Sequence, residues 1–172
     1  MRSTKENAWP RAACKGMEVS KPMKISEVMK PDDVLIDVSV SSKGRLLQQL
    51  SDKAARALGV SERDILAALE SREALGSTGI GAGIAIPHAP VAGIEWPFGL
   101  FVRLTKPIEF DAIDDEPVDI VCLILTPPEG QANHLKLLAN VARQLRSEHV
   151  LKRIRSTREA NHIYSAITEC DD

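Results

Sequence analysis

The sequence predicts an α/β domain in which helices and strands form packed layers. Helical and strand-like patterns alternate along the chain. The segment Val118–Leu125 is apolar except at Asp119, as expected for a strand that is buried on both faces of a sheet. A chain of 172 residues with 44% hydrophobic residues is long enough for one domain with a sizeable core.

The first half of the chain contains one predicted strand and two predicted helices. Val34–Val38 has the composition of a strand. The pair Ser41–Ser42 can cap a helix that ends at Gly59. Ser61 begins a second helix that is expected to end near Arg72. The apolar residues expected on the buried face of the first helix are Leu46, Leu47, Leu50, Ala54, Ala57 and Leu58.

The second half is predicted to alternate strands with three helices. Phe98–Leu104 is a further strand, and Pro127–Gly130 interrupts the chain after the buried one. Asn133 is expected to cap a long helix, His149–Ile154 to form a short one, and Thr157 to cap the last. The buried stripe expected on the long helix contains Leu135, Leu138, Val141, Ala142 and Leu145.

The N-terminal residues differ from the rest of the chain. Met1–Pro22 is polar without a clear period, so we expect a disordered extension before a folded unit that spans residues 23–169. The three scattered cysteines, Cys14, Cys122 and Cys170, fit neither a disulfide framework nor a zinc site. No apolar run is long enough to span a membrane, and no signal core follows the basic N-terminus. The expected location is the cytoplasm.

The charge balance argues against a nucleic-acid partner. The net charge is −2 at neutral pH and aromatic residues make up only 3% of the chain. Nucleic-acid binders usually carry a strong basic field or aromatic residues on which bases stack. We therefore expect no nucleic acid among the partners.

A glycine-rich stretch leads to a histidine. The segment Gly76–His88 contains four glycines, then an apolar run, a proline and His88 itself. Glycine is favoured where the backbone needs a positive φ or a close approach, and ordering such a segment costs entropy. The stretch is predicted to shape the backbone around His88. This setting alone fits a reactive imidazole and a core histidine about equally.

Other side chains near this stretch could contribute chemistry. His134 is expected in the first turn of the long helix, where the dipole suits a phosphate and keeps an imidazole neutral. Taken alone, a surface histidine near the helix cap is the commoner case. Arg72 could place its guanidinium on a phosphoryl oxygen or stabilise a helix end, and Glu73 could pair with it. Ser77 and Thr78 could donate hydroxyl hydrogen bonds or satisfy a turn.

Several familiar motifs are absent from the sequence. Gly79, Gly81 and Gly83 are spaced G-x-G-x-G, which is neither a dinucleotide fingerprint nor a P-loop. His88 and His134 have no third ligand at metal-site spacing. We therefore predict no metal and no cofactor.

Taken in order, these segments resemble the active-site signature of enzyme IIA proteins of the phosphoenolpyruvate-dependent phosphotransferase system, fructose/mannitol type. The matching stretches are Arg72-Glu73, Gly76–Gly81, Ile84–His88, Pro107–Phe110 with Asp114, Pro117–Asp119, Ile120–Leu125 and His134–Leu138. The resemblance covers roughly residues 23–169 as an enzyme IIA type 2 domain. The short form without transporter domains is most similar to the nitrogen-regulatory branch.

The resemblance implies a fold and a role for each matching residue. The fold would be a mixed sheet of about five strands flanked by helices. His88 would accept a phosphoryl group from a phosphohistidine on a small HPr-like phosphocarrier protein. His134 would be the second active-site histidine, and Arg72 matches a position near the active site. The groups expected to bind the phosphoryl oxygens belong to Ser77, Thr78, Gly79 and Gly81.

Three outputs remain open for such a protein. Phosphorylation could switch its binding to regulatory targets, such as transporters or kinases, in nitrogen or general metabolism. Alternatively, the phosphate could pass to a sugar permease component during uptake, or the chain could be a binding module that is never phosphorylated. The family often has Gly and then Lys or Arg after the histidine, whereas this chain has Ala89-Pro90. We expect extended backbone there and a changed choice of partner.

Overall fold

The computed structural model describes residues 23–169. The predicted extension, Met1–Pro22, lies outside the described residues, as do Cys14 and Cys170. The remaining cysteine, Cys122, is buried in β6 (Val118–Thr126). Burial raises the pKa of its thiol to about 12, which leaves it protonated at neutral pH.

A mixed six-stranded sheet forms the centre of the described chain, where about five strands were expected. The strand order is β1-β5-β6-β3-β2, and β4 also pairs with β6. The pairs β5–β6 and β2–β3 are antiparallel, and the pairs of β1 with β5 and of β6 with β3 and β4 are parallel. The remaining strands are β1 (Val34–Val38), β2 (Gly79–Gly81), β3 (Ile84–Ala85), β4 (His88–Pro90) and β5 (Phe98–Ile108).

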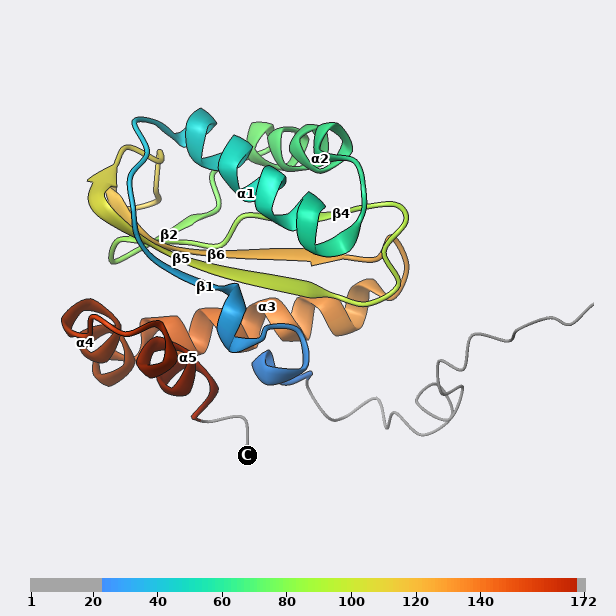
Figure 1. Ribbon diagram of the computed structural model, residues 1–172. Coiled ribbons are helices and arrows are strands. Elements are labelled where there is room, and N and C mark those ends of the chain that lie inside the picture. The colour runs from blue at the N-terminus through green and yellow to red at the C-terminus, as the bar shows by residue number, and fades with distance from the viewer. Residues whose placement is uncertain (1–22, 170–172) are drawn as a thin grey trace, which may run out of the picture.

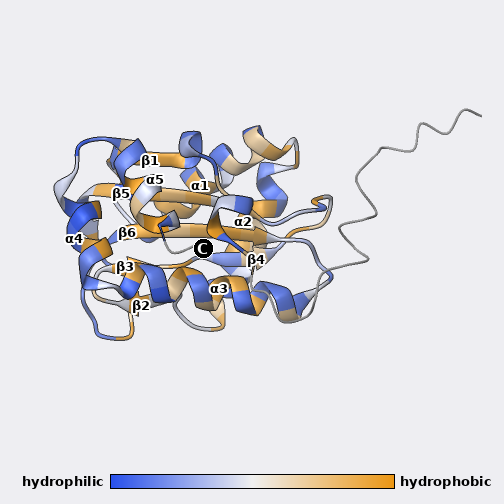
Figure 2. Cartoon of the chain, turned by 90° about the horizontal axis from the view of Figure 1, so that it is seen from below, coloured by the Kyte–Doolittle hydropathy of each residue, from blue (hydrophilic) through white to orange (hydrophobic). Residues whose placement is uncertain are grey.

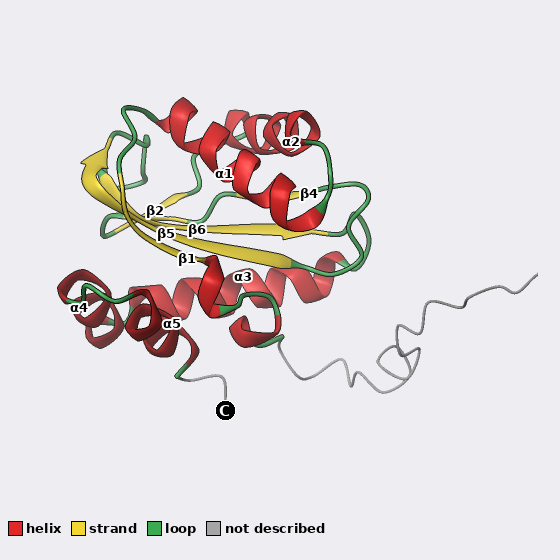
Figure 3. Cartoon of the chain, in the orientation of Figure 1, coloured by secondary structure: helices red, strands yellow, loops and turns green. Residues whose placement is uncertain are grey.

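Helices cover both faces of the sheet (Figure 1). The loops gather at the ends of the strands (Figure 3). The first face carries α1 (Lys43–Leu58) and α2 (Glu62–Ala74). The second carries α3 (Gln131–Arg146), α4 (Glu148–Ser156) and α5 (Ala160–Thr168). Short 3₁₀ turns at Ile25–Glu27 and Pro31–Asp33 precede β1.

The core has two halves, separated by the sheet. Residues such as Ile124 and Leu137 pack on the α3 side, and residues such as Leu50 and Leu125 pack on the α1–α2 side. The central strand β6 is largely hydrophobic along its length (Figure 2). The prediction that Val118–Leu125 is buried on both faces is confirmed, because β6 contributes side chains to both halves.

The predicted ends of the first two helices are largely confirmed. The Ser42 hydroxyl accepts a hydrogen bond from the Arg45 N–H at the start of α1, and Gly59 ends that helix with a φ of 68°. The Ser61 hydroxyl caps α2 in the same way, and α2 continues past Arg72 to Ala74. On α1, Ala57 is exposed rather than buried.

The structure corrects the prediction for the third helix. Gly130, with a φ of 84°, caps α3 in place of Asn133. Leu135 is 67% exposed, and Leu137 is buried in its place. The buried face of α3 includes two polar side chains, Asn140 and Gln144, which a search for apolar residues does not place in a core. The helix is therefore rotated relative to the predicted stripe.

The cap of the last helix also differs from the prediction. Thr157 ends α4, and α5 begins with Glu159 as its N-cap residue. The Thr157 hydroxyl instead accepts a hydrogen bond from the Glu159 N–H in the connection between the two helices. Within residues 23–169, no helix is long and apolar enough to cross a membrane.

Candidate functional site

His88 opens the short strand β4 at the sheet margin. It pairs with Ile124 of β6, and no other described strand pairs with β4. Ile124 packs on the α3 side of the sheet, whereas Ala89 and its partner Leu125 pack on the α1–α2 side. Because paired residues of parallel strands point to the same face, the His88 ring belongs to the α3 side. The strand continues through Pro90, which confirms the expected extended backbone after the histidine.

Hydrogen bonds on both ring nitrogens determine the tautomer of His88. Nδ1 lies 2.8 Å from the carbonyl oxygen of Ile86, which can only accept, so Nδ1 carries the proton. Nε2 therefore keeps its lone pair and accepts a hydrogen bond of 3.3 Å from Nε of Arg72. Burial, opposed by the Ile86 carbonyl, lowers the pKa of His88, and the charge of Arg72 lowers it further. The ring is thus held neutral with a nucleophilic nitrogen next to a cation.

Arg72 reaches this ring from the last turn of α2, which contacts β4. Its Nη1 donates a hydrogen bond of 2.9 Å to the Gly76 carbonyl. Nη2 has no partner among residues 23–169. The guanidinium is therefore anchored at one nitrogen and still has donors for an incoming anion.

Glu73 was considered as a possible partner of Arg72, but it pairs with Lys43 instead. Its carboxylate lies 2.8 Å from the Lys43 Nζ and accepts hydrogen bonds from both the N–H and the hydroxyl of Thr78. Thr78 in turn accepts the Ile86 N–H on its carbonyl, two residues before His88. Lys43 was not predicted as a site residue from the sequence. The sequence contained one indication of a role for Lys43. A lysine in the first turn of a helix is disfavoured by the helix dipole, so such a residue is expected to have another purpose.

The other glycine-stretch residues make contacts away from the His88 ring. The Ser77 hydroxyl donates to the Phe110 carbonyl at 2.7 Å and accepts the Gly79 N–H. A Cβ on Gly79 would lie 2.7 Å from the Cβ of Ala112, so only glycine fits there. Gly81 is aligned through β3 with Ile120, four residues before the partner of His88 on β6, about 13 Å along the strand. Of the four predicted phosphoryl-binding residues, Thr78 is the one linked to the surroundings of His88.

His134 lies in the first turn of α3, on the same side of the sheet as the His88 ring. It lines an open cavity of about 640 Å³ together with Trp96 and Pro127. Burial lowers the pKa of its imidazole. Its ring makes no hydrogen bond to another described residue, and none joins it to His88. The structure therefore brings Arg72 directly to His88 and leaves His134 beside an open space.

The turn at residues 114–116 contains three acidic residues, and one of them binds backbone N–H groups from two segments. The Asp114 carboxylate accepts hydrogen bonds from the N–H groups of Ala82 and Glu116, which lower the pKa of that carboxyl. Within residues 23–169 no three His, Cys, Asp or Glu side chains are grouped as metal ligands would be.

The chemistry available at this margin follows from the His88 ring and Arg72. A neutral imidazole with a free lone pair can attack an electrophilic centre. A guanidinium beside that nitrogen can hold the oxygens of a tetrahedral anion in two directions. The pair is suited to receiving a phosphoryl group.

Comparison with known sequences identifies the family of the chain. Residues 27–170 match the family model described as phosphoenolpyruvate-dependent sugar phosphotransferase system, EIIA 2. A nitrogen regulatory protein of Bradyrhizobium diazoefficiens is 43% identical over 145 residues, which cover 84% of this chain and 95% of that protein. A fructose-specific EIIA component of Haloferax volcanii is 32% identical, covering 84% of this chain and 95% of its own.

A solved structure has the same architecture. The nitrogen regulatory protein IIA-Ntr from Neisseria meningitidis is 31% identical and superposes with a TM-score of 0.80. The match covers 84% of this chain and 99% of that protein. This chain thus shares its fold with a nitrogen regulatory protein.

Proposed function

Because the chain belongs to the enzyme IIA 2 family of the phosphoenolpyruvate-dependent sugar phosphotransferase system, we propose that it accepts a phosphoryl group on Nε2 of His88. The donor is a phosphohistidine of a small HPr-like phosphocarrier protein. One observation carries the proposal. The hydrogen bond from Nδ1 to the Ile86 carbonyl leaves the lone pair of His88 on Nε2, next to a cationic donor.

The transfer needs no net movement of protons. The Nε2 lone pair forms the new N–P bond while the N–P bond of the donor breaks, and that electron pair returns to the donor nitrogen. The His88 ring keeps its Nδ1 proton and becomes a phosphoimidazolium, so its hydrogen bond to the Ile86 carbonyl becomes charge-assisted. The donor ring loses its positive charge as the phosphoryl group leaves. Catalysis then consists of positioning and electrostatic support.

Two side chains are proposed to stabilise the transferred group. Arg72 gives up its hydrogen bond to Nε2 and turns its free guanidinium donors to the phosphoryl oxygens. His134, neutral and without another partner, donates one ring N–H across the open cavity. Thr78 is the nearest candidate of the glycine stretch for a further contact, and Ser77, Gly79 and Gly81 shape the backbone that supports it.

The proposed output is regulation of nitrogen or general metabolism. A phosphoryl group adds about −1.5 to −2 charges at a site where Ala89 and Pro90 carry none. Such a change repels acidic partners and attracts basic ones, so it can alter the binding of regulatory targets such as transporters or kinases. A relative that shares nearly its full length with this chain is named a nitrogen regulatory protein. We place the exchange in the cytoplasm, where phosphoenolpyruvate is made.

A second candidate output is relay of the phosphate to a sugar permease component. The similarity to a fructose-specific EIIA component favours it. A chase experiment separates the two outputs. Rapid loss of phosphate to a permease subunit supports relay, whereas a long-lived phosphoprotein with altered partner binding supports regulation.

Mass spectrometry tests the shared chemistry. The protein is incubated with phosphoenolpyruvate and the upstream carriers, and the phosphorylated peptide is identified. The expected result is one acid-labile, base-stable phosphate on His88. A wild-type protein that stays unmodified while the carrier is phosphorylated would contradict the proposal and favour a binding module that is never phosphorylated.

A further inference from the structure

We propose that Lys43 and Glu73 form a positioning pair that holds Arg72 against His88; this inference rests on the proposed function. Neither side chain touches the His88 ring by a hydrogen bond. Both act through the last turn of α2, which carries Arg72, and through Thr78. Their role is to keep the guanidinium where the phosphoryl group arrives.

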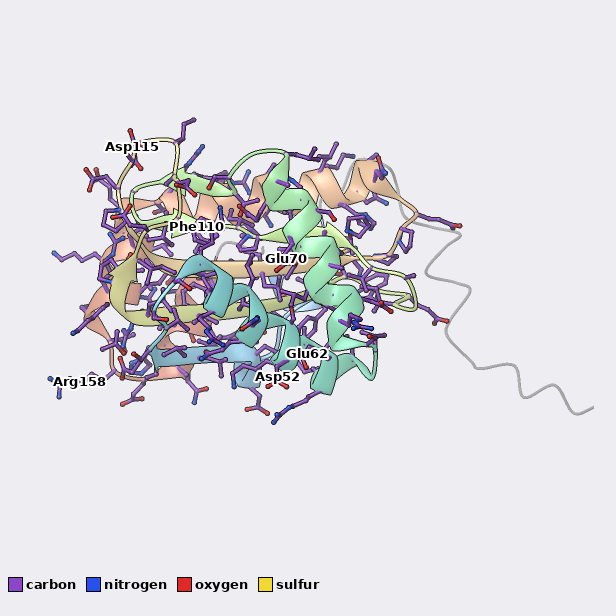
Figure 4. All side chains as sticks on the ribbon, turned by 90° about the horizontal axis from the view of Figure 1, so that it is seen from above. Asp52, Glu62, Glu70, Phe110, Asp115 and Arg158 are labelled. Atoms are coloured by element: carbon purple, nitrogen blue, oxygen red, sulfur yellow. The ribbon has the colours of Figure 1, made fainter. Side chains whose placement is uncertain are left out.

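The contacts of Lys43 join three separate parts of the chain. Its Nζ lies 2.8 Å from the Glu73 carboxylate, 3.3 Å from the Phe110 carbonyl and 3.9 Å from the Asp111 carboxylate. It also sits 4.5 Å above the centre of the Phe110 ring. Phe110 lies beside the start of α1 when the molecule is seen from above (Figure 4). One ammonium group thus ties together the start of α1, the end of α2 and the connection between β5 and β6.

Glu73 is a buried charge whose partners are all accounted for. Its side chain is 5% exposed. The carboxylate accepts from the Thr78 N–H at 3.2 Å, from the Thr78 hydroxyl and from Lys43. A buried carboxylate is costly unless it is paired and hydrogen-bonded. Lys43 therefore supplies the positive charge that compensates the buried carboxylate at the end of α2.

Both residues stand at the unfavourable end of their own helix. Lys43 is the first residue of α1, where the dipole disfavours a cation, and Glu73 is in the last turn of α2, where it disfavours an anion. Local helix stability therefore does not account for either. Residues that break a local rule are expected at functional sites, and here the two exceptions bind each other.

The Lys43–Glu73 pair can hold Arg72 in position because Glu73 directly follows Arg72 in the sequence. Arg72 donates to His88 from the same helical turn, and its other anchor is the carbonyl of Gly76. Glu73 binds the chain on both sides of the Gly76 carbonyl. The backbone carbonyl of Glu73 accepts a hydrogen bond from the Gly76 N–H, and its carboxylate accepts one from the Thr78 N–H. Loss of the ion pair would free this turn and let the guanidinium drift from Nε2.

The test compares Glu73→Gln and Lys43→Met with the loss of a carboxylate from an ion pair elsewhere. Asp37 of β1, the strand at the opposite margin of the sheet, pairs with Arg103 of β5. Its side chain is 66% exposed, whereas that of Glu73 is 5% exposed, so Asp37→Asn controls for the lost charge and not for burial. Phosphoryl acceptance from a phosphorylated HPr-like carrier is measured for each variant. We expect Glu73→Gln and Lys43→Met to lower kcat about tenfold or more through misplacement of Arg72. The KM for the carrier should stay within about twofold, and Asp37→Asn should match the wild type.

A double-mutant cycle distinguishes positioning from a general loss of structure. In an Arg72→Gln background, adding Glu73→Gln should slow transfer by less than about twofold, because the group it acts through is already gone. Lys43→Arg should keep most of the wild-type rate. A full tenfold loss in the Arg72→Gln background, or a Glu73→Gln variant as fast as Asp37→Asn, would overturn the proposal.

A spectroscopic readout needs neither carrier nor turnover. Nitrogen NMR of the His88 ring reports the hydrogen bond at Nε2 directly. The Nε2 resonance of Lys43→Met should shift in the direction seen for Arg72→Gln, and an unshifted resonance would overturn the proposal even if Glu73→Gln fails to fold. If the wild-type protein takes no phosphate from the carrier, the proposed function fails while this NMR comparison still decides the role of the pair.

Discussion

The two histidines on the α3 side of the sheet have opposite degrees of restraint. His88 is hydrogen-bonded at both ring nitrogens, whereas the ring of His134 has no hydrogen-bond partner among residues 23–169. Burial lowers the pKa of both. A phosphoryl acceptor needs one nitrogen aimed in advance, and a group that only contacts the transferred oxygens can orient when they arrive. From this difference in restraint we propose the acceptor role for His88 and the contact role for His134.

Removal of His88 should have the largest effect. His88→Ala eliminates the nitrogen that forms the new N–P bond, so phosphorylation by the carrier should be abolished. Radiolabelled phosphate transfer measures this, with the unfolding temperature as a check that the protein still folds. Labelling at the wild-type rate would show that another residue is the acceptor, and the proposed difference in role between His88 and His134 would be wrong.

Arg72→Gln should come next, because it removes the cation that restrains His88. We expect transfer to slow about 10²-fold, a typical cost for losing one donor to a developing anion. The pKa of His88 should rise, since the charge of Arg72 lowers it in the wild type. Transfer kinetics and an NMR titration measure the two effects. Arg63→Gln, an exposed arginine on the same helix, is the matched control and should change neither.

His134→Ala should have a smaller effect, in keeping with the looser restraint of this ring. We expect transfer to slow about tenfold while the fold and some phosphorylation remain, since general positioning by one neutral donor is worth less than the acceptor itself. His149→Ala removes an exposed histidine from α4 and should leave the rate unchanged. Equal rates for the two variants would remove His134 from the site.

Acidification should show the smallest effect, and it should act mainly through His88. The ring must be neutral to attack, and its pKa lies below the ordinary value of 6.5. The transfer rate should be constant above pH 6.5 and fall only below it. The measurement is the rate of transfer as a function of pH, with a carrier whose own pH dependence is known. A rate that already falls between pH 8 and pH 7 would contradict the lowered pKa.

The same pKa shift has a consequence for stability. A histidine whose folded-state pKa is lowered binds protons more readily when the chain is unfolded. Stability should therefore decrease as the pH falls from about 6.5 through the folded-state pKa. In His88→Gln this part of the pH dependence should disappear, as measured by denaturant unfolding at several pH values. An unchanged slope would show that other groups cause it.

Much of the architecture could be predicted from local sequence patterns. The β6 run, the Ser42 cap and the Gly59 stop were placed correctly, because each depends on residues within one helical turn or one strand. The stripe of α3 was not. Burial of Asn140 is compensated by a hydrogen bond to the Met23 carbonyl, 117 residues away, and this allowed the helix to turn Leu135 outward.

The sequence by itself determined the candidate residues: the glycine stretch ends at His88, Arg72 precedes it, and His134 is near the start of a helix. Only the tertiary structure decided which of them touch, because Arg72 contacts His88 and His134 does not. The lone pair on Nε2 depends on a carbonyl two residues back and a guanidinium sixteen residues away. The partner of Glu73 is Lys43 on another helix, and not its neighbour Arg72. Periodicity reports which side of an element is buried, whereas a hydrogen bond between elements depends on how the sheet and its helices pack.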